Sequence, residues 1–181
     1  LFHPVLERIQ QAIREDPVRY VVMHWAKWGT FTDDLLWNLV SHEVSLAIAL
    51  FGGHPCSTTI ISEHGTLTPR DIVSLVCRFD GGRECAIHVN RCARSANKHL
   101  TAVTRQGRMF DWDRDTLAIF AANGDLVDTY HAQEEPLAVE VKAFLNALRT
   151  GSSSSGEEGC RVVEVVEPLH VRRETPMGLR P

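Results

Sequence analysis

The chain has 181 residues, of which 44% are hydrophobic and 23% are charged, a balance typical of one globular domain with a sizeable core. Its formal net charge of -4 and pI near 6.1 disfavour a nucleic-acid-binding surface. No apolar run is long enough to cross a bilayer and no secretory signal opens the chain, so we expect a cytoplasmic protein with neither nucleic acid nor membrane as a partner.

The first predicted elements are a helix and a strand. Residues 3–16 have apolar residues at helical spacing, with Pro4 in the first turn, and Pro17 ends the helix. Residues 18–28 are rich in β-branched and aromatic side chains and predict a strand. Both of its faces are partly apolar, so we expect it to be central in a sheet. One face carries Tyr20, Val22, His24, Ala26 and Trp28, and the other carries Val21, Met23, Trp25 and Lys27.

The longest apolar run predicts a second helix, from about Asp33 to Phe51, which Gly52 and Gly53 would end. Asp34, Asn38 and His42 recur every four residues and would lie along one side of it. Two interpretations are open for this line. It is either a helix-start carboxylate, a solvated amide and a structural histidine, or one wall of a pocket in which His42 relays a proton.

The rest of the chain predicts strands joined by tight turns, followed by helices. A short strand over 56–63 precedes hairpins that turn at Asp80-Gly81-Gly82, at Gly107 and at Asn123-Gly124. This gives a run of about six strands. Helices are expected over 136–149 and over 160–166, the latter interrupted by Pro168.

This order predicts an α+β fold with one large, mainly antiparallel open sheet and helices packed on one face. We expect residues 1–181 to form a single substrate-binding and oligomerisation domain. The other sheet face would not be uniformly polar, which favours a homodimer or higher assembly through it. Positions expected to contribute to this uncovered face are Val73, Leu75, Cys77, Ala86, His88 and Ile119.

Motifs that hold cofactors or metals are absent from the sequence. It contains no G-x-G-x-x-G, no Walker loop, no H-E-x-x-H and no G-x-S-x-G. The five cysteines include no C-x-x-C pair, and at least two fall in predicted strands, which favours buried reduced thiols over a disulfide framework or a zinc site. A dinucleotide site would have to lie on another domain.

Four segments, in this order, resemble the C-terminal domain of the oxidoreductases that include glucose-fructose oxidoreductase, inositol dehydrogenase and the rhizopine-catabolism dehydrogenase (the Gfo/Idh/MocA family). The resemblance spans nearly all of the chain. The segments are LFHPVLERIQQAIREDPVRYVVMHW, LWNLVSHEVSLAIALFGGHP, TAVTRQGRMFDWD and EEPLAVEVKAFLNALRTG.

The resemblance implies a two-domain enzyme whose N-terminal dinucleotide-binding domain, with its E-K-P lysine, is not part of this chain. NAD or NADP would bind the complete enzyme but not this chain alone, which we expect to be inactive. An aspartate and a histidine near the reacting carbon in the family map onto Asn38 and His42. Because an amide cannot relay a proton, Asp34 or His42 alone would assume that role. Glu43 replaces the usual aspartate after the histidine.

Other residues are candidates for substrate binding. Lys27 and His24, near the end of the first strand, could meet sugar hydroxyls, although such side chains are more often solvated. Arg91, with Arg94 and Lys98, could hold a phosphate or a nucleotide-sugar diphosphate, or could form a solvated loop. Trp28, like Trp25 and Trp37, is either a core or pocket-wall aromatic or a stacking surface for a sugar.

The residues and the resemblance leave two functions open. The first is the substrate domain of an NAD(P)-dependent oxidoreductase that acts on a sugar, a cyclitol or a similar hydroxy compound by hydride transfer. The second is a non-catalytic binding or dimerisation module derived from the same family. The substrate and the choice between NAD and NADP stay open.

Overall fold

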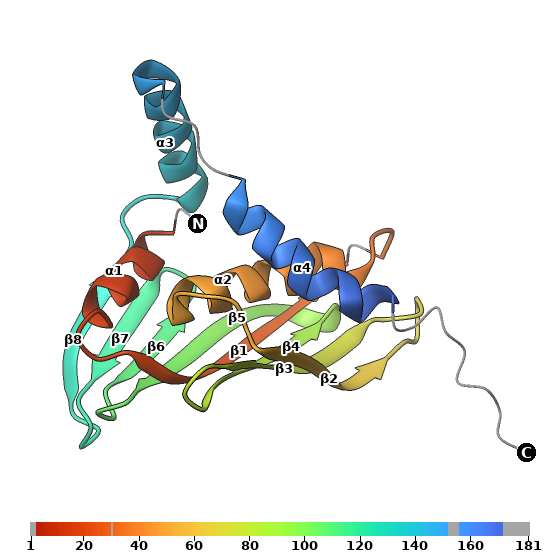
Figure 1. The fold of residues 1–181 in the computed structure, drawn as a ribbon, viewed down its shortest axis with the longest axis horizontal. Coiled ribbons are helices and arrows are strands. Elements are labelled where there is room, and N and C mark those ends of the chain that lie inside the picture. Colours follow the sequence, from red (N-terminus) through yellow and green to blue (C-terminus); the bar gives the residue numbers. More distant parts are fainter. Residues whose placement is uncertain (1–2, 30, 152–155, 172–181) are drawn as a thin grey trace, which may run out of the picture.

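One sheet of eight strands organises the computed structural model, which describes residues 3–29, 31–151 and 156–171 (Figure 1). The strand order is β2-β3-β4-β1-β5-β6-β7-β8. Neighbouring strands are antiparallel except β1 and β4, which are parallel. The predicted α+β class with a mainly antiparallel open sheet is therefore confirmed. The strands are β1 (Val18–Trp28), β2 (Ser57–His64), β3 (Ile72–Phe79), β4 (Arg83–Asn90), β5 (Cys92–Thr104), β6 (Met109–Asp113), β7 (Thr116–Phe120) and β8 (Leu126–His131).

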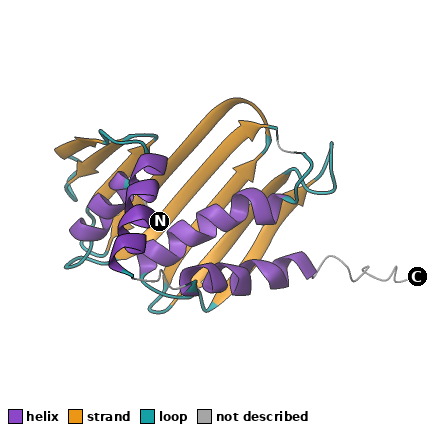
Figure 2. Ribbon diagram, turned by 90° about the horizontal axis from the view of Figure 1, so that it is seen from above, coloured by secondary structure: helices purple, strands orange, loops and turns teal. Residues whose placement is uncertain are grey.

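Three helices lie over one face of this sheet and leave the other face uncovered (Figures 1 and 2). They are α1 (Pro4–Ala12), α2 (Ser41–Phe51) and α4 (Glu157–Val171). A fourth helix, α3 (Pro136–Thr150), projects away from the sheet beside the N-terminal end of the described chain, and none of its residues is buried. Within the described residues, no helix combines the length and apolar character needed to span a membrane.

The core lies between these three helices and the inner face of the sheet. On β4, for example, Cys85, Ile87 and Val89 are buried, whereas the alternate residues Ala86 and His88 point to the uncovered face. The other main members of the core share this inner side: Val5, Leu6 and Ile9 of α1, Val44, Ala47 and Phe51 of α2, Val165, Val166 and Leu169 of α4, and Val21, Met23, Leu75, Leu100, Phe110 and Leu117 of the sheet.

Four positions predicted for the uncovered face are on the inner face instead. Strand alternation fixes two faces, but only pairing with neighbouring strands decides which of them meets the helices. Val73, for instance, pairs with the buried Val89 and is itself buried. The corrected residues are Val73, Leu75, Cys77 and Ile119, all buried under the helices.

The second predicted helix is not a regular α-helix over its whole length. It begins with a π-helical segment, η1 (Leu36–Val40), that runs directly into α2. Within this segment Leu36, Leu39 and Val40 are all buried. A π-turn accommodates one extra residue, which here widens the apolar face toward the core. The helix ends, as predicted, at Gly52, whose φ of 73° suits glycine.

Element boundaries differ from the prediction where tertiary pairing extends or shortens them. Seven strands follow α2 rather than about six, and β5 begins at Cys92 because its first residues pair with the end of β1 at Trp28. Helix α1 ends at Ala12, before Asp16. Helix α4 contains Pro168 instead of being interrupted by it, since apolar residues on both sides of the proline pack into the core.

A buried ion pair fixes the loop between β2 and β3. Asp71 Oδ2 accepts hydrogen bonds from the backbone N–H groups of residues 66–68 at 2.6, 2.6 and 3.1 Å, and Asp71 Oδ1 lies 3.2 Å from Arg91 Nε. Burial alone would raise the pKa of Asp71, but hydrogen bonds from the Thr68 hydroxyl and from these backbone groups outweigh it and hold the pKa well below its ordinary value of 3.8. The carboxylate thus stabilises the fold only while it is ionised.

We predict that Asp71→Ala lowers the free energy of unfolding by about 3 kcal/mol, because Arg91 loses a buried carboxylate partner and the backbone N–H groups of residues 66–68 lose their acceptor. Urea denaturation at neutral pH measures this. The unfolded carboxyl titrates near pH 4, so the difference between wild type and variant should shrink as the pH falls below about 4. Glu15→Ala, at an exposed carboxylate, is the control and should change stability little.

Candidate functional site

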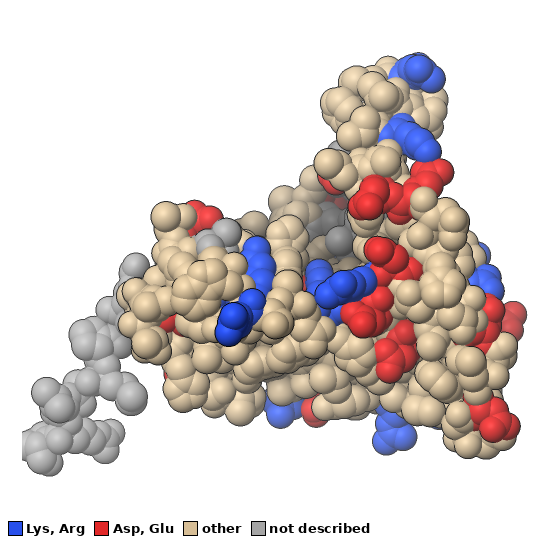
Figure 3. Space-filling view, turned by 180° about the vertical axis from the view of Figure 1, so that it is seen from behind, with Lys and Arg blue, Asp and Glu red and all other residues tan. Residues whose placement is uncertain are grey.

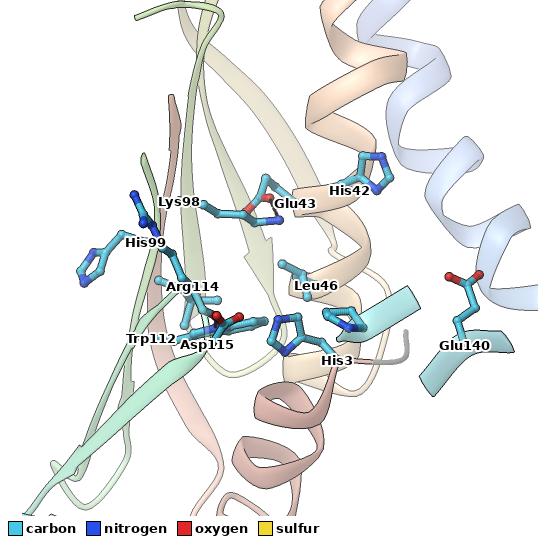
Figure 4. Close-up of a pocket in the computed structure, with 12 residues that line it drawn as sticks. His3, His42, Glu43, Leu46, Lys98, His99, Trp112, Arg114, Asp115 and Glu140 are labelled. Carbon is cyan, nitrogen blue, oxygen red and sulfur yellow. Dashed lines mark hydrogen bonds and ion pairs between the residues drawn. The ribbon is translucent and has the colours of Figure 1, made fainter. Parts of the chain in front are cut away.

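A cavity of about 360 Å³ lies on the helix-covered side, between the start of α1, helix α2, strands β5 and β6, and the base of α3 (Figure 4). Acidic and basic side chains gather below the base of α3 on the molecular surface (Figure 3). Leucine and tryptophan side chains provide an apolar lining, and the remaining walls are polar. The lining residues are His3, His42, Glu43, Leu46, Lys98, His99, Leu100, Trp112, Arg114, Asp115, Pro136 and Glu140.

Lys98 and Glu43 form an ion pair in the middle of this cavity. Lys98 is on the inner face of β5, two residues before the buried Leu100, so its side chain points toward the helices. Its ammonium lies 2.9 Å from Glu43 Oε1, and Glu43 is only 1% exposed. The same ammonium is 4.1 Å from the ring centre of Trp25, the residue that pairs with Lys98 across β1 and β5.

His42 is in the first turn of α2 and lines the rim of the cavity. Its ring meets Trp25 edge-on, with the ring centres 5.8 Å apart. Partial burial lowers the pKa of His42, and the positive charges of Lys98 and Lys27 lower it further, while the carboxylate of Glu43 opposes them. A neutral imidazole is therefore favoured at neutral pH, and this form accepts a proton.

His3 and Trp112 form the opposite wall of the cavity. His3 caps α1, because its Nδ1 accepts a hydrogen bond from Val5 N at 3.2 Å. Its ring contacts Trp112 edge-on at 4.6 Å between centres. Burial lowers the pKa of His3, an effect that Asp115 opposes and Lys98 supports. The wall thus joins an apolar surface to a polar, mainly neutral ring.

This arrangement suits a small polyhydroxylated molecule. An ammonium, two imidazoles and the carboxylates of Asp115 and Glu140 offer both donors and acceptors for hydroxyl groups. Leu46, Leu100 and Trp112 offer apolar surface for the carbon skeleton. Chemically, a neutral imidazole at the rim is able to accept a proton from a substrate hydroxyl.

The structure does not bring the predicted line of Asp34, Asn38 and His42 together at the cavity. Asp34 accepts a hydrogen bond from Leu36 N at 2.8 Å and lies 3.5 Å from Arg70 Nη1 and 3.7 Å from His170 Nδ1. Asn38 is in the π-helical segment and donates to Asp33 Oδ2 at 2.8 Å. The spacing of four residues predicted one line only for a regular α-helix, and the π-turn breaks that regularity.

Predicted residues of the first strand are divided between the two sides of the sheet. Lys27 points to the helix-covered side, where its ammonium lies 5.5 Å from the ring centre of Trp25. His24 is on the uncovered side and stacks on His88 at 5.1 Å. Trp28 is 62% exposed at the end of β1 and contacts Phe31. Only Lys27 is therefore close to the surroundings of His42.

Arg91 was expected at the surface, in a phosphate-binding cluster or a solvated loop, but the structure buries it. It is 2% exposed and donates to Asp71, to Thr68, to the backbone of Arg70 and to the backbone of Asp33. Its neighbour in the expected phosphate cluster, Lys98, instead enters the cavity. Arg91 and Lys98 are close in the sequence, and this closeness gave no sign that one side chain is buried and the other enters the cavity.

Sequence reasoning missed the pairing of Lys98 with Glu43 and the roles of His3, Trp112 and Asp115 in the cavity. One signal was available: both Lys98 and Glu43 interrupt apolar faces, one on a strand and one on a helix. A charged residue on a buried face needs a partner of opposite charge. Nothing in the local pattern identified the other three residues.

Comparisons with known proteins concern the fold. No protein-family model and no curated protein matches the chain. The solved UDP-N-acetylglucosamine 3-dehydrogenase GnnA from Acidithiobacillus ferrooxidans matches with a TM-score of 0.81 and 21% identity over 93% of this chain and 57% of that one. The dehydrogenase MviM from Clostridium difficile matches with a TM-score of 0.74 and 14% identity, over 94% of this chain and 59% of that one. A candidate myo-inositol dehydrogenase from Sinorhizobium meliloti 1021 matches with a TM-score of 0.72 and 15% identity, over 96% of this chain and 61% of that one.

The chain shares the fold of these dehydrogenases. The resemblance predicted from the four sequence segments is thereby confirmed at the level of the fold. The chain spans 57% to 61% of the length of these dehydrogenase structures. About two fifths of each of them therefore has no counterpart in this sequence.

We predict that His3 makes the domain less stable in mild acid. Because the pKa of His3 is lowered in the folded chain, the unfolded chain takes up its proton first, and stability falls as the pH drops below about 6.5. His3→Asn keeps a capping side chain without an imidazole. The variant should lose less stability than wild type between about pH 7.5 and pH 5 in urea denaturation. Equal losses would show that His3 carries no such linkage.

Proposed function

We propose that this chain is the substrate-binding and oligomerisation domain of an NAD(P)-dependent oxidoreductase of the glucose-fructose oxidoreductase family. The substrate is a sugar, a cyclitol or a similar hydroxy compound, and the reaction is hydride transfer. The observation that carries the proposal is His42: the residue singled out by the sequence resemblance lines a cavity with apolar and charged walls in a domain with the dehydrogenase fold. The activity for which GnnA is named, on a nucleotide sugar, supports a sugar-like substrate.

The cofactor does not fit on this chain. The sequence contains no glycine-rich turn of the G-x-G-x-x-G type to hold a pyrophosphate at a helix start. The nicotinamide, when bound to a separate dinucleotide-binding domain, would exchange a hydride with a substrate carbon. We therefore expect the 181-residue chain alone to bind neither NAD nor NADP.

The residues of this chain would bind the substrate and handle its proton. When an alcohol is oxidised, its carbon loses a hydride and its hydroxyl loses a proton. In its neutral form His42 accepts that proton, and it returns the proton during reduction. Glu140, Asp115 and His3 would hold further hydroxyls, and Trp112 would pack against the ring of the substrate.

Helix α3 supports the presence of a further domain. Its apolar residues are exposed, although they repeat at the spacing of a packed helix face. They are Leu137, Val141, Phe144, Leu145 and Leu148, with 47% to 69% exposure. The first turn of α3 also lines the cavity through Pro136 and Glu140. A domain packed on α3 would therefore cover an apolar face and close the cavity at the same time.

We predict that His42→Ala lowers turnover by about two to four orders of magnitude in the complete enzyme, because a general acid or base is lost. The assay follows nicotinamide reduction with a panel of sugars, cyclitols and nucleotide sugars, using this domain joined to a family dinucleotide-binding domain. His64→Ala, at an exposed histidine of β2, is the matched control and should retain activity. Asn38→Asp should be tolerated.

An alternative, a non-catalytic module, is favoured by one observation: Asn38 stands where the family has a carboxylate, and its amide is bound to Asp33. If the joined enzyme turns over no hydroxy compound in the panel while it binds NAD or NADP, the alternative is supported. Turnover that survives His42→Ala unchanged would remove His42 from the mechanism but leave the oxidoreductase function in place.

We also propose that the uncovered sheet face associates with a second copy of the chain. Tyr20 and Val22 at the centre of that face are 43% and 41% exposed, and helices cover only the other side. Wild type should be a dimer by light scattering, and Val22→Arg should shift it to monomer, since two charges would meet at the interface. Leu137→Arg, on α3, is the control and should leave the dimer intact. A monomeric wild type at high concentration would contradict the proposal.

A further inference from the structure

Lys98 is a positive charge held in one position in the cavity that His42 also lines. Its ammonium is restrained on one side by Glu43 at 2.9 Å and on another by the face of Trp25 at 4.1 Å. Its side chain is nevertheless 41% exposed, so the charge borders the cavity instead of being sealed below it. Two restraints on a flexible side chain indicate a fixed charge in place of a mobile surface lysine.

Trp25 connects this charge to His42. The indole lies under Lys98 and meets the His42 ring at its edge, with ring centres 5.8 Å apart. Lys27 approaches the same indole at 5.5 Å. His42 thus shares an aromatic neighbour with two ammonium groups, and Glu43 is the residue that follows it in α2. Groups that face the cavity from the other elements are His3 of α1, Arg114 and Asp115 of the β6–β7 turn, and Glu140 of α3, whereas the side chain of His99 on β5 points away from the cavity and bonds Asp111.

We propose that Lys98, clamped by Glu43 and Trp25, is a positioning residue whose fixed positive charge favours the uncharged His42 imidazole, the form that accepts a hydroxyl proton from the substrate. The catalytic half of this statement rests on the proposed function. The electrostatic half concerns this chain alone. It assigns the Lys98 and Glu43 pair a role beyond holding α2 on the sheet.

The sign of each effect follows from the charges. Burial is the largest cause of the lowered pKa of His42. Lys98 disfavours a second positive charge on the ring and lowers the pKa further, whereas Glu43 favours that charge and raises the pKa. Removing the carboxylate should therefore lower the pKa of His42, and removing the ammonium should raise it. Both effects come from charge alone, so substitutions that remove a charge while keeping the packing isolate them.

The experiment is an NMR titration of the histidine ring protons of the 181-residue chain. Lys98→Met alone would leave Glu43 as an unpaired buried carboxylate, which could take up a proton and mask the shift. The decisive comparison is therefore Glu43→Gln against Glu43→Gln with Lys98→Met. In the glutamine background, loss of Lys98 should raise the pKa of His42 by on the order of half a pH unit. Glu43→Gln alone should lower it relative to wild type.

Matched controls separate charge from packing. Lys98→Arg keeps the charge and should leave the His42 titration close to wild type. Lys142→Met, at an exposed lysine of α3 paired with Glu134, should not move it. The exposed His64 serves as an internal reference in every sample. Chemical-shift dispersion in the same spectra reports whether each variant is folded.

Either of two outcomes would overturn the proposal. In the first, the pKa of His42 is equal in Glu43→Gln and in Glu43→Gln with Lys98→Met. In the second, Lys98→Arg changes the pKa of His42 as much as Lys98→Met does in the glutamine background. The proposed function fails separately. An inactive complete enzyme would refute it without altering these titrations, which need neither cofactor nor substrate. In an active enzyme, the acid limb of the rate profile should move to higher pH when Lys98 is lost from the glutamine background.

Discussion

Strand β1 pairs along most of its length with two strands at once, β4 in parallel and β5 antiparallel, and the rest of the structure depends on this double pairing. Its register places Trp25 beside Lys98 and Val89, on the side that the helices cover. The same register turns His24 and Val22 to the opposite side. A shift of one residue would exchange the two faces and would bury the polar one.

Covering one face of the sheet creates both the core and the cavity. Helix α2 buries its apolar residues against the inner face of the sheet, yet it also brings Glu43 into this contact. A buried carboxylate without a partner is costly, and Lys98 from β5 supplies the partner. The Lys98–Glu43 pair thus lies between the middle of β5 and the first turn of α2, and the cavity begins beside it.

The function proposed here would be shared between this chain and a separate dinucleotide-binding domain. The chain provides a cavity with donors, acceptors and an aromatic wall, but its sequence contains no G-x-G-x-x-G motif for a dinucleotide pyrophosphate. The apolar face of helix α3 is exposed to solvent in this structure. A sugar or cyclitol held between this cavity and a cofactor domain would be shielded from water, which strengthens every charge interaction around His42.

The sequence by itself determined the elements that rest on local patterns. The strand over residues 18–28, the glycine turns at residues 81 and 82, and the glycine end of α2 all follow from alternation or from a positive φ that glycine alone tolerates well. The order of segments also indicated the dehydrogenase fold. These features need no knowledge of distant contacts.

Only the tertiary structure decided which face of each strand is covered and which charges meet. Asp34 and Asn38 were expected beside His42 at the cavity, but the helix begins with a π-turn, and their side chains bond the backbone of Leu36 and the carboxylate of Asp33 instead. Arg91 and Lys98 are close in sequence, yet strand pairing buries one against Asp71 and opens the other into the cavity beside Glu43. Their partners lie 20 and 55 residues away along the chain, and no local periodicity encodes contacts over such separations.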